Sequence, residues 1–163
     1  MKIGIIGSGN VGSALGKIWA SNGNEIMFSS RHPENLKGLA ESIGKNACYG
    51  LPAGAAKYSE VLVLSVPWTQ AIDALKSAGS INGKVLIDCT NPLKPDMSGL
   101  AIGHTTSAAE EVAKAAPGAK VVKAFNTTFA ALMRSPSRTF GSQKAPASTV
   151  ETTALQRPSF QGS

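Results

Sequence analysis

Long apolar runs, cysteine clusters and charge-rich segments are all missing from this 163-residue chain. No stretch approaches the roughly 18 apolar residues of a transmembrane helix, so no membrane span is predicted. The first apolar run is short and broken by glycines, which does not match the hydrophobic region of a signal peptide. We therefore expect a cytoplasmic protein that does not associate with membranes.

Charged residues make up only 16% of the chain, and no run of lysine or arginine is present. Half of the net charge of +6 falls in residues 134–163, so the remainder is only mildly basic. A nucleic-acid partner is not expected, because binding to phosphate backbones favours a concentrated basic surface. An anionic cofactor explains a modest positive bias equally well.

Only two cysteines are present, Cys48 and Cys89, and they form no C-x-x-C pair. Together with His32 and His104 they match no recognised metal-ligand spacing, so no metal site is predicted. We interpret both cysteines as buried free thiols in a reducing compartment.

A glycine-rich loop follows the apolar strand predicted over residues 2–6 and precedes a helical pattern. It consists of Gly7, Ser8, Gly9, Asn10, Val11 and Gly12. In this context the first glycine allows a tight turn, the second lets a pyrophosphate approach the backbone, and the third allows close packing of helix on strand. The positive end of the helix then faces the phosphates. The pattern predicts a dinucleotide site, the alternative being an ordinary glycine-rich turn.

The end of the second predicted strand lacks the acid that bonds the ribose 2′-hydroxyl in NAD-binding units. Ser30 and Arg31 stand there instead. A guanidinium forms charge-assisted hydrogen bonds to a 2′-phosphate, which a carboxylate would repel. The predicted cofactor is therefore NADP. The alternative is a solvated arginine in the turn before Pro33.

Strand and helix patterns alternate through residue 133. Strands are expected within 2–6, 23–28, 46–49, 61–66, 84–88 and 120–125, and helical segments within 11–22, 33–43, 54–58, 69–78, 107–116 and 127–133. Ser107 and Glu110 have the spacing of a capping box at one helix start. Six strands alternating with helices predict an α/β fold with a doubly wound parallel sheet, the Rossmann arrangement.

The composition changes after Met133. Residues 134–163 are rich in serine, threonine and proline and show no periodicity of 2 or 3.6. We therefore divide the chain into an NADP-binding Rossmann domain at 1–133 and a segment at 134–163 that does not join the core. That segment is interpreted as a flexible tail, or as a replaced, non-native end.

Several segments in order along residues 1–133 carry a family resemblance: IGIIGSGNVGSALGKIWASNG, MFSSRHPENL, VLVLSVPWTQAID, VLIDCTNPL and TSAAEEVAKAAPGAKVVKAFNTTFAALM. Together they resemble the NADP-dependent oxidoreductases typified by coenzyme F-420:NADP reductase. More widely, they are similar to the cytosolic reductase domain of the six-transmembrane metalloreductases. The serine–arginine pair after strand two and the proline–tryptophan pair after strand four are more specific than the glycine loop.

The resemblance implies hydride transfer between NADP(H) and a flavin- or deazaflavin-type acceptor, with no catalytic acid or base from the protein. The implied pyrophosphate contacts are Ser8, Gly9, Asn10 and Val11. Ser30 and Arg31 would hold the 2′-phosphate. Val66 and Pro67, at the carboxyl end of strand four, would line the nicotinamide half. Asn91, Pro92 and Ala124 are at the carboxyl ends of strands five and six, where ligands bind in open α/β sheets.

Alternatives remain for several of these positions. The alternative for Pro67 is a proline that only ends the strand. The alternatives for Trp68 are a position in the core, a dimer surface or a wall of the substrate pocket. Asn126 suits either a carboxamide contact or a helix cap. Asp88 and Cys89 are given no chemical role.

The family's members usually continue with further strands that complete the substrate pocket and often the dimer, whereas residues 134–163 show no such pattern. A homodimer is therefore one open expectation. The alternative function is a non-catalytic NADP-binding module, either a sensor or a truncated remnant.

Overall fold

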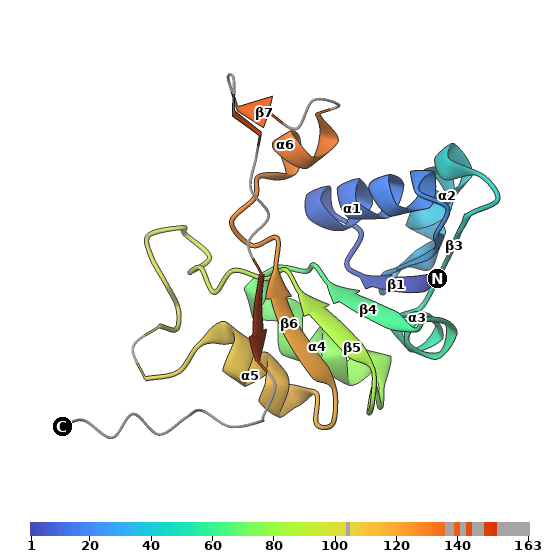
Figure 1. Cartoon of the computed structure of the whole chain (residues 1–163). Helices are drawn as coiled ribbons and strands as arrows, with labels where there is room; N and C mark the ends of the chain where they lie inside the picture. Colours follow the sequence, from blue (N-terminus) through green and yellow to red (C-terminus); the bar gives the residue numbers. More distant parts are fainter. Residues whose placement is uncertain (104, 136–138, 141–142, 145–148, 153–163) are drawn as a thin grey trace.

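The computed structural model describes residues 1–103, 105–135, 139–140, 143–144 and 149–152. A seven-stranded sheet in the order β3-β2-β1-β4-β5-β6-β9 forms its centre (Figure 1). The strands are β1 (Lys2–Ile6), β2 (Glu25–Ser29), β3 (Ala47–Gly50), β4 (Val61–Leu64), β5 (Val85–Asp88), β6 (Lys120–Ala124) and β9 (Thr149–Thr152). The first six are mutually parallel, which confirms the predicted doubly wound sheet.

Helices connect these strands. They are α1 (Asn10–Ser21), α2 (Lys37–Ile43), α3 (Pro52–Tyr58), α4 (Trp68–Ala78), α5 (Ala108–Ala115) and α6 (Ala130–Arg134), with a 3₁₀ turn η1 (Pro33–Leu36) before α2. Helix α5 begins with the predicted capping box, in which the Ser107 hydroxyl accepts from the Glu110 N–H and the Glu110 carboxylate accepts from the Ser107 N–H. Helix α6 is shorter than expected, because it begins at Ala130 instead of Thr127.

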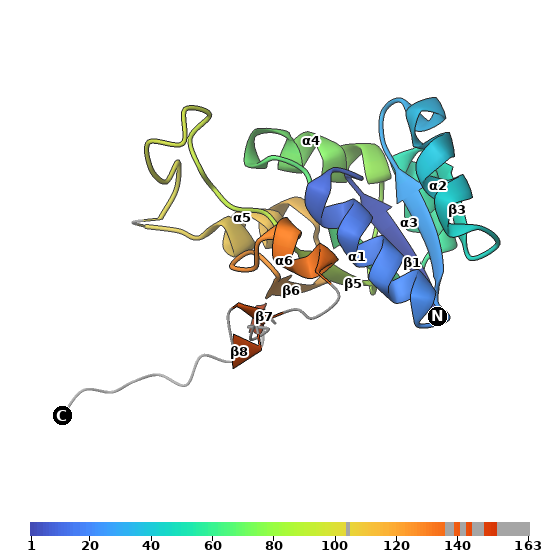
Figure 2. The ribbon, with the colours of Figure 1, turned by 90° about the horizontal axis from the view of Figure 1, so that it is seen from above.

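Helices cover both faces of the sheet, as Figures 1 and 2 show. On one face, buried side chains of α1 and α6 pack against Ile5 and Phe28. On the other, α3, α4 and α5 pack against Leu62, Leu64 and Leu86. The central strands read as continuous apolar runs because both of their faces are buried, as is typical of parallel sheets.

The strand order reverses between β1 and β4, which are hydrogen-bonded neighbours at the middle of the sheet. Chain connections leave β1 toward β2 on one side and leave β4 toward β5 on the other. In open α/β sheets, ligands bind in the crevice beyond the carboxyl ends of the strands at such a reversal. The topology therefore directs attention to the loops after β1 and β4.

The structure differs from the sequence-based expectation at residues 149–152. This segment pairs antiparallel with β6 as β9, with Thr149 opposite Ala124 and Thr152 opposite Val121. Strand pairing through backbone groups covers the edge of β6 and requires no hydrophobic periodicity, which is why composition alone did not reveal it. Two-residue strands β7 (Thr139–Phe140) and β8 (Gln143–Lys144) form a separate hairpin. The other residues of 136–163 lie outside the described part of the chain.

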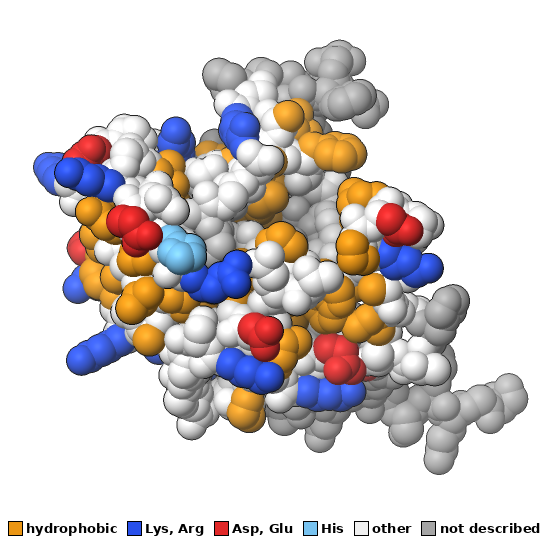
Figure 3. All heavy atoms as spheres, turned by 180° about the vertical axis from the view of Figure 1, so that it is seen from behind, with side chains coloured by type: hydrophobic (Ala, Val, Ile, Leu, Met, Phe, Trp, Pro, Cys, Tyr) orange, Lys and Arg blue, Asp and Glu red, His pale blue; other side chains and the backbone are white. Residues whose placement is uncertain are grey.

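Within the described residues, no helix combines the length and apolar character needed to cross a membrane. On the face drawn in Figure 3, positive and negative side chains are interspersed around hydrophobic groups.

Candidate dinucleotide site at the carboxyl edge of the sheet

Two adjoining pockets lie along the carboxyl edge of the parallel sheet. The first, called here the β2 pocket, has a volume of about 370 Å³ and is lined by Gly7, Ser30, Arg31 and Gln70 among others. The second, the β5 pocket, has a volume of about 420 Å³, and its lining includes Asn10, Cys89, Thr90 and Asn91. Both pockets share Gly9, Ser65, Val66 and Pro67. They therefore meet where the strand order reverses.

The glycine loop closes tightly on β4 at two of its three glycines. Gly7 has φ +94°, and a Cβ there would lie 2.5 Å from Val66 Cγ1. A Cβ on Gly12 would lie 2.1 Å from the Gly7 carbonyl oxygen. These two positions admit only glycine, since the contacts are far inside van der Waals distance.

Gly9 differs from the other two glycines, because a Cβ there would meet nothing within 4 Å. It occupies the N-cap position of α1, where no side chain caps the helix and no acidic residue stands in the first turn. The first N–H groups of a helix have no intrahelical acceptor, and the helix end carries partial positive charge. The space beside Gly9 therefore suits an anion such as a pyrophosphate.

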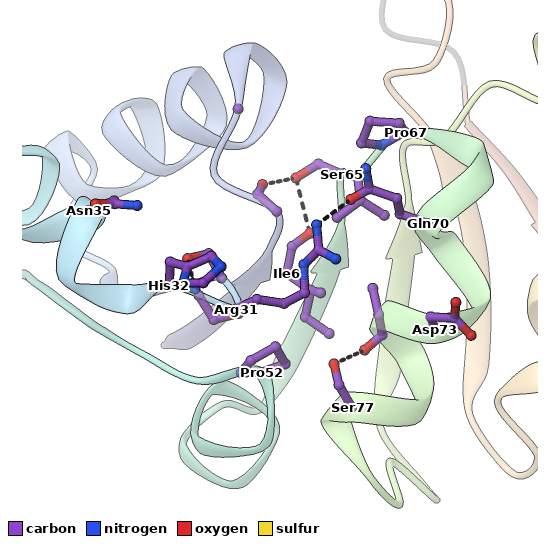
Figure 4. Close-up of a pocket in the computed structure, with 16 residues that line it drawn as sticks. Ile6, Arg31, His32, Asn35, Pro52, Ser65, Pro67, Gln70, Asp73 and Ser77 are labelled. Atoms are coloured by element: carbon purple, nitrogen blue, oxygen red, sulfur yellow. Dashed lines mark hydrogen bonds between the residues drawn. The ribbon is translucent and has the colours of Figure 1, made fainter. Parts of the chain in front are cut away.

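Ser65 joins the glycine loop to the end of β4. Its hydroxyl donates to the Gly7 carbonyl oxygen at 2.5 Å, as the dashed line in Figure 4 shows. The position was not singled out from the sequence, although it directly follows a buried strand at the expected edge. The Ser65 contact fixes the loop at the junction of the two pockets.

Arg31 reaches across the β2 pocket from the loop after β2. Figure 4 shows its guanidinium directed at α4, where it donates to Gln70 Oε1 at 3.4 Å. Ser30 is held nearby, since its N–H donates to the Gly50 carbonyl and its hydroxyl accepts from the His32 N–H. The preceding residue, Ser29, is fully buried and donates to the Ile5 carbonyl. The end of β2 therefore presents a cation and a hydroxyl, with no carboxylate.

Asn10 makes a contact that the sequence did not suggest. Its side-chain oxygen accepts a hydrogen bond of 2.6 Å from Arg134, which lies at the end of α6. Arg134 also donates to the Asn10 main-chain carbonyl oxygen at 3.3 Å, which ties the end of α6 to the start of α1 beside the β5 pocket.

The remaining predicted positions divide into two groups. Val66 and Pro67 lie just beyond β4 and line both pockets, with Pro67 as the N-cap residue of α4. Val11 and Asn91 line the β5 pocket. Neither of the two pockets includes Ser8, Gly12, Pro92 or Ala124 in its lining. Ala124 is buried, and the Ser8 hydroxyl donates to the Ser29 carbonyl.

The structure also brings residues to the pockets that sequence reasoning missed. The β2 pocket gains His32, Asn35 and Asp73, and the β5 pocket gains Thr90, Leu93, Lys94 and Met97. Trp68, which was left between three alternatives, lines the β5 pocket. Most of these residues lie on loops, where periodicity gives no signal.

Cys89 lies in the wall of the β5 pocket and is only 7% exposed. Burial, together with the nearby Asp88 carboxylate, raises the pKa of its thiol to about 12, while Lys123 opposes the shift. The thiol is therefore neutral near pH 7 and acts as a packing group. Cys48, which was expected to be buried, is instead exposed on β3 because this strand forms the edge of the sheet.

No group of three or more histidine, cysteine, aspartate or glutamate side chains could hold a metal ion among the residues described by the structure. His104, considered with the cysteines above, lies outside them.

The chain is similar to several known proteins. An F420-dependent NADP reductase from Methanothermobacter marburgensis is 32% identical over 148 residues, which cover 82% of this chain and 66% of that protein. The metalloreductase STEAP3 of Rattus norvegicus is 30% identical over 125 residues, 77% of this chain and 24% of that protein. The chain thus spans about a quarter of one relative and just under two thirds of the other.

A solved structure, a putative F420-dependent NADP reductase from Arthrobacter sp. FB24, superposes with a TM-score of 0.84 at 29% identity. The match covers 94% of this chain and 74% of that one. The family model described as "NADP oxidoreductase coenzyme F420-dependent" matches residues 2–92, which include the glycine loop, Arg31 and the end of β4. This chain belongs to that family of NADP oxidoreductases.

Proposed function

We propose that this chain is an NADP-dependent oxidoreductase that transfers a hydride between NADP(H) and a flavin- or deazaflavin-type acceptor. The adenosine half of the cofactor would occupy the β2 pocket and the nicotinamide half the β5 pocket. The observation that carries this proposal is the placement of Arg31. Its guanidinium lines the β2 pocket at the end of β2, where an NAD-specific site would present a carboxylate.

Recognition of the 2′-phosphate follows from the chemistry at this strand end. Arg31 offers charge-assisted hydrogen bonds, and Ser30 adds a neutral hydroxyl close by. Gln70 holds the guanidinium over the pocket, so less conformational freedom is lost when an anion binds. The residues directly after β2, Ser30 and Arg31, include no carboxylate that would accept a hydrogen bond from the 2′-hydroxyl of NADH.

The pyrophosphate would lie at the start of α1. Gly9 leaves the helix end open, whereas Gly7 and Gly12 hold the loop against β4. Backbone N–H groups and the helix dipole then face the phosphates without a competing acidic side chain in the first turn. The residues present therefore suit a dinucleotide.

The β5 pocket would receive the nicotinamide and the acceptor ring. Trp68, Leu93 and Met97 give it apolar walls, and Val66 with Pro67 separates it from the β2 pocket. NADPH, when bound, supplies the hydride from its nicotinamide ring. The protein's part is to orient the two rings and exclude water, which itself lowers the barrier substantially. The name of the Methanothermobacter relative supports a deazaflavin acceptor.

An acceptor screen tests this function. The protein would be mixed with NADPH and with FMN, FAD or a deazaflavin, and loss of the nicotinamide absorbance would be followed. We expect oxidation that depends on both protein and acceptor. NADPH binding without oxidation by any of these acceptors would support the non-catalytic module, and failure to bind NADPH would reject both functions.

A further inference from the structure

A buried ion pair joins the ends of β5 and β6 beside the β5 pocket. Asp88 is the last residue of β5 and fully buried, and Lys123 lies directly opposite it in the strand register. The Lys123 ammonium donates to Asp88 Oδ2 at 2.8 Å, with 14% of the lysine side chain exposed. Sequence reasoning gave Asp88 no role and did not single out Lys123.

The ion pair holds the main chain of Thr90 from both sides. Asp88 Oδ1 accepts from the Thr90 N–H at 2.9 Å, and the Lys123 ammonium donates to the Thr90 carbonyl oxygen. The third ammonium contact is with Thr90 Oγ1 at 3.3 Å. Thr90 lies between Cys89 and Asn91, and all three line the β5 pocket. The pair therefore fixes one wall of that pocket through the backbone.

The neighbouring loop is tied to the same wall. Asn91 Nδ2 donates to the Asn126 carbonyl oxygen at 2.8 Å, which connects the loops after β5 and β6. Phe125, just before, has φ +63°, a left-handed conformation that is costly for an aromatic residue. Its ring packs edge-on against Trp19 of α1, which holds the residue in place.

A buried ion pair is a poor device for stability alone. Removing two charges from water is expensive, and apolar residues of similar size often stabilise a core equally well. Its placement at the carboxyl edge, with every ammonium contact directed at Asp88 or Thr90, is better explained by a need for defined geometry.

We propose that Asp88 and Lys123 are positioning residues that hold Thr90 and Asn91 in the geometry required by the nicotinamide half of the cofactor. This inference rests on the proposed function, because it assumes that the β5 pocket receives that half. It assigns the pair no contact with the cofactor. It predicts that disturbing the pair weakens binding of the nicotinamide half selectively.

The test compares two ligands on the full chain. NADPH occupies both pockets in the proposed pose, whereas adenosine 2′,5′-bisphosphate lacks the nicotinamide and would occupy the β2 pocket alone. The main variant is the double substitution Asp88→Asn with Lys123→Met, which removes both charges together and leaves no unpaired buried charge. Asp88→Asn alone is the second variant: it keeps an acceptor for the Thr90 N–H but leaves the Lys123 ammonium without its counter-charge, so it should also lower the melting temperature.

We expect the double variant to bind adenosine 2′,5′-bisphosphate like the wild type and NADPH about tenfold more weakly. Asp88→Asn should also lower the affinity for NADPH relative to that for adenosine 2′,5′-bisphosphate, by a smaller factor. The matched control is Lys84→Met, which removes another partly buried lysine that donates to a backbone carbonyl, that of Ser59 before β4. The control should lower the melting temperature without changing the ratio of the two affinities.

Each outcome decides a different claim. An unchanged ratio in both variants, with only the melting temperature lowered, would overturn the positioning role and leave the proposed function intact. Should the double variant fail to fold, the ratio measured for Asp88→Asn decides the question alone. Wild-type protein that binds neither ligand would reject the proposed function, and this inference with it.

Discussion

The β2 pocket and the β5 pocket differ in how their residues are brought together. The residues that would recognise the cofactor in the β2 pocket come from short segments that carry their own signals, the glycine loop and the two residues after β2, while α4 completes the lining with Gln70 and Asp73. The β5 pocket depends on contacts between residues far apart in the chain, such as Lys123 with Thr90 and Asn91 with Asn126. Local chemistry thus defines the first, and tertiary packing defines the second.

This difference bears on function. A site made of local motifs can be interpreted from sequence, and it indicates which anion the protein recognises. A site made by tertiary contacts determines how the nicotinamide and acceptor rings are oriented, so small displacements there affect both the binding of these rings and the reaction between them. Substitutions in the β2 pocket should therefore change cofactor choice, whereas those around the β5 pocket should change geometry.

Gly9→Val is expected to have the largest effect. The new side chain would project into the open space at the start of α1, where a pyrophosphate would lie. Titration calorimetry should detect no binding of NADPH or NADH, while circular dichroism shows a folded protein. Gly38→Val is the matched control, because its Cβ also meets nothing within 4 Å but lies on α2. Normal binding by Gly9→Val would mean that the loop has only a structural role.

Arg31→Ala sharpens the assignment of the β2 pocket. NADPH affinity should fall about ten- to a hundredfold, equivalent to about 1.4–2.8 kcal/mol, with NADH affinity nearly unchanged. Lys45→Ala also removes one positive charge, but just before the amino end of β3, whereas the pockets lie at the carboxyl ends of the strands. This control should leave both affinities unaltered. An equal loss for both cofactors in Arg31→Ala would refute the 2′-phosphate assignment.

Ser65→Ala tests the junction that both pockets share. Loss of its hydrogen bond to the Gly7 carbonyl should lower the free energy of unfolding by about 1 kcal/mol and weaken both cofactors a few fold. Ser42→Ala removes a comparable hydroxyl contact on the exposed side of α2 and should change neither quantity. Chemical denaturation and calorimetry on the two variants provide the comparison. A cofactor affinity unaffected by Ser65→Ala would mean that the hydrogen bond to the glycine loop does not influence cofactor binding.

The smallest expected effect concerns the thiol in the β5 pocket. Burial raises the pKa of Cys89 to about 12 from an ordinary value near 9, so the neutral thiol favours the folded state below pH 9. That contribution is lost as the pH rises toward 12. Iodoacetamide at pH 8 should therefore modify exposed Cys48 first and Cys89 only after unfolding, as peptide mass analysis would show. Equal rates of modification of Cys48 and Cys89 in the folded protein would indicate that the reagent reaches the wall of the β5 pocket.

Much of the fold could be predicted because its signals are local. Apolar runs marked the central strands, glycines marked helix ends, and Ser107 with Glu110 marked the start of α5. Strand β9 could not be predicted, since pairing with β6 depends on backbone groups and on an edge that exists only in the folded sheet. The short 3₁₀ turn before α2 was likewise merged with the helix that follows it.

The candidate site divides in the same way. The sequence pointed to Gly9 and Arg31 because their residue types suit specific chemistry at fixed distances from a strand end, and both line the β2 pocket. Ser65, Gln70 and Lys123 were missed because each acts on a residue at least 33 positions away. Nothing in the sequence near Asn10 indicates that Arg134 binds its side chain. Such contacts become visible only when the chain is folded.

The central claim is that the carboxyl edge of this sheet binds NADP(H) and distinguishes it from NAD(H) through the residues after β2. Calorimetric titration of the wild-type protein with NADPH and with NADH tests it most directly. We predict that NADPH binds at least about tenfold more tightly than NADH, with one molecule per chain. Equal affinity for the two cofactors, or no heat of binding with either, would contradict the account.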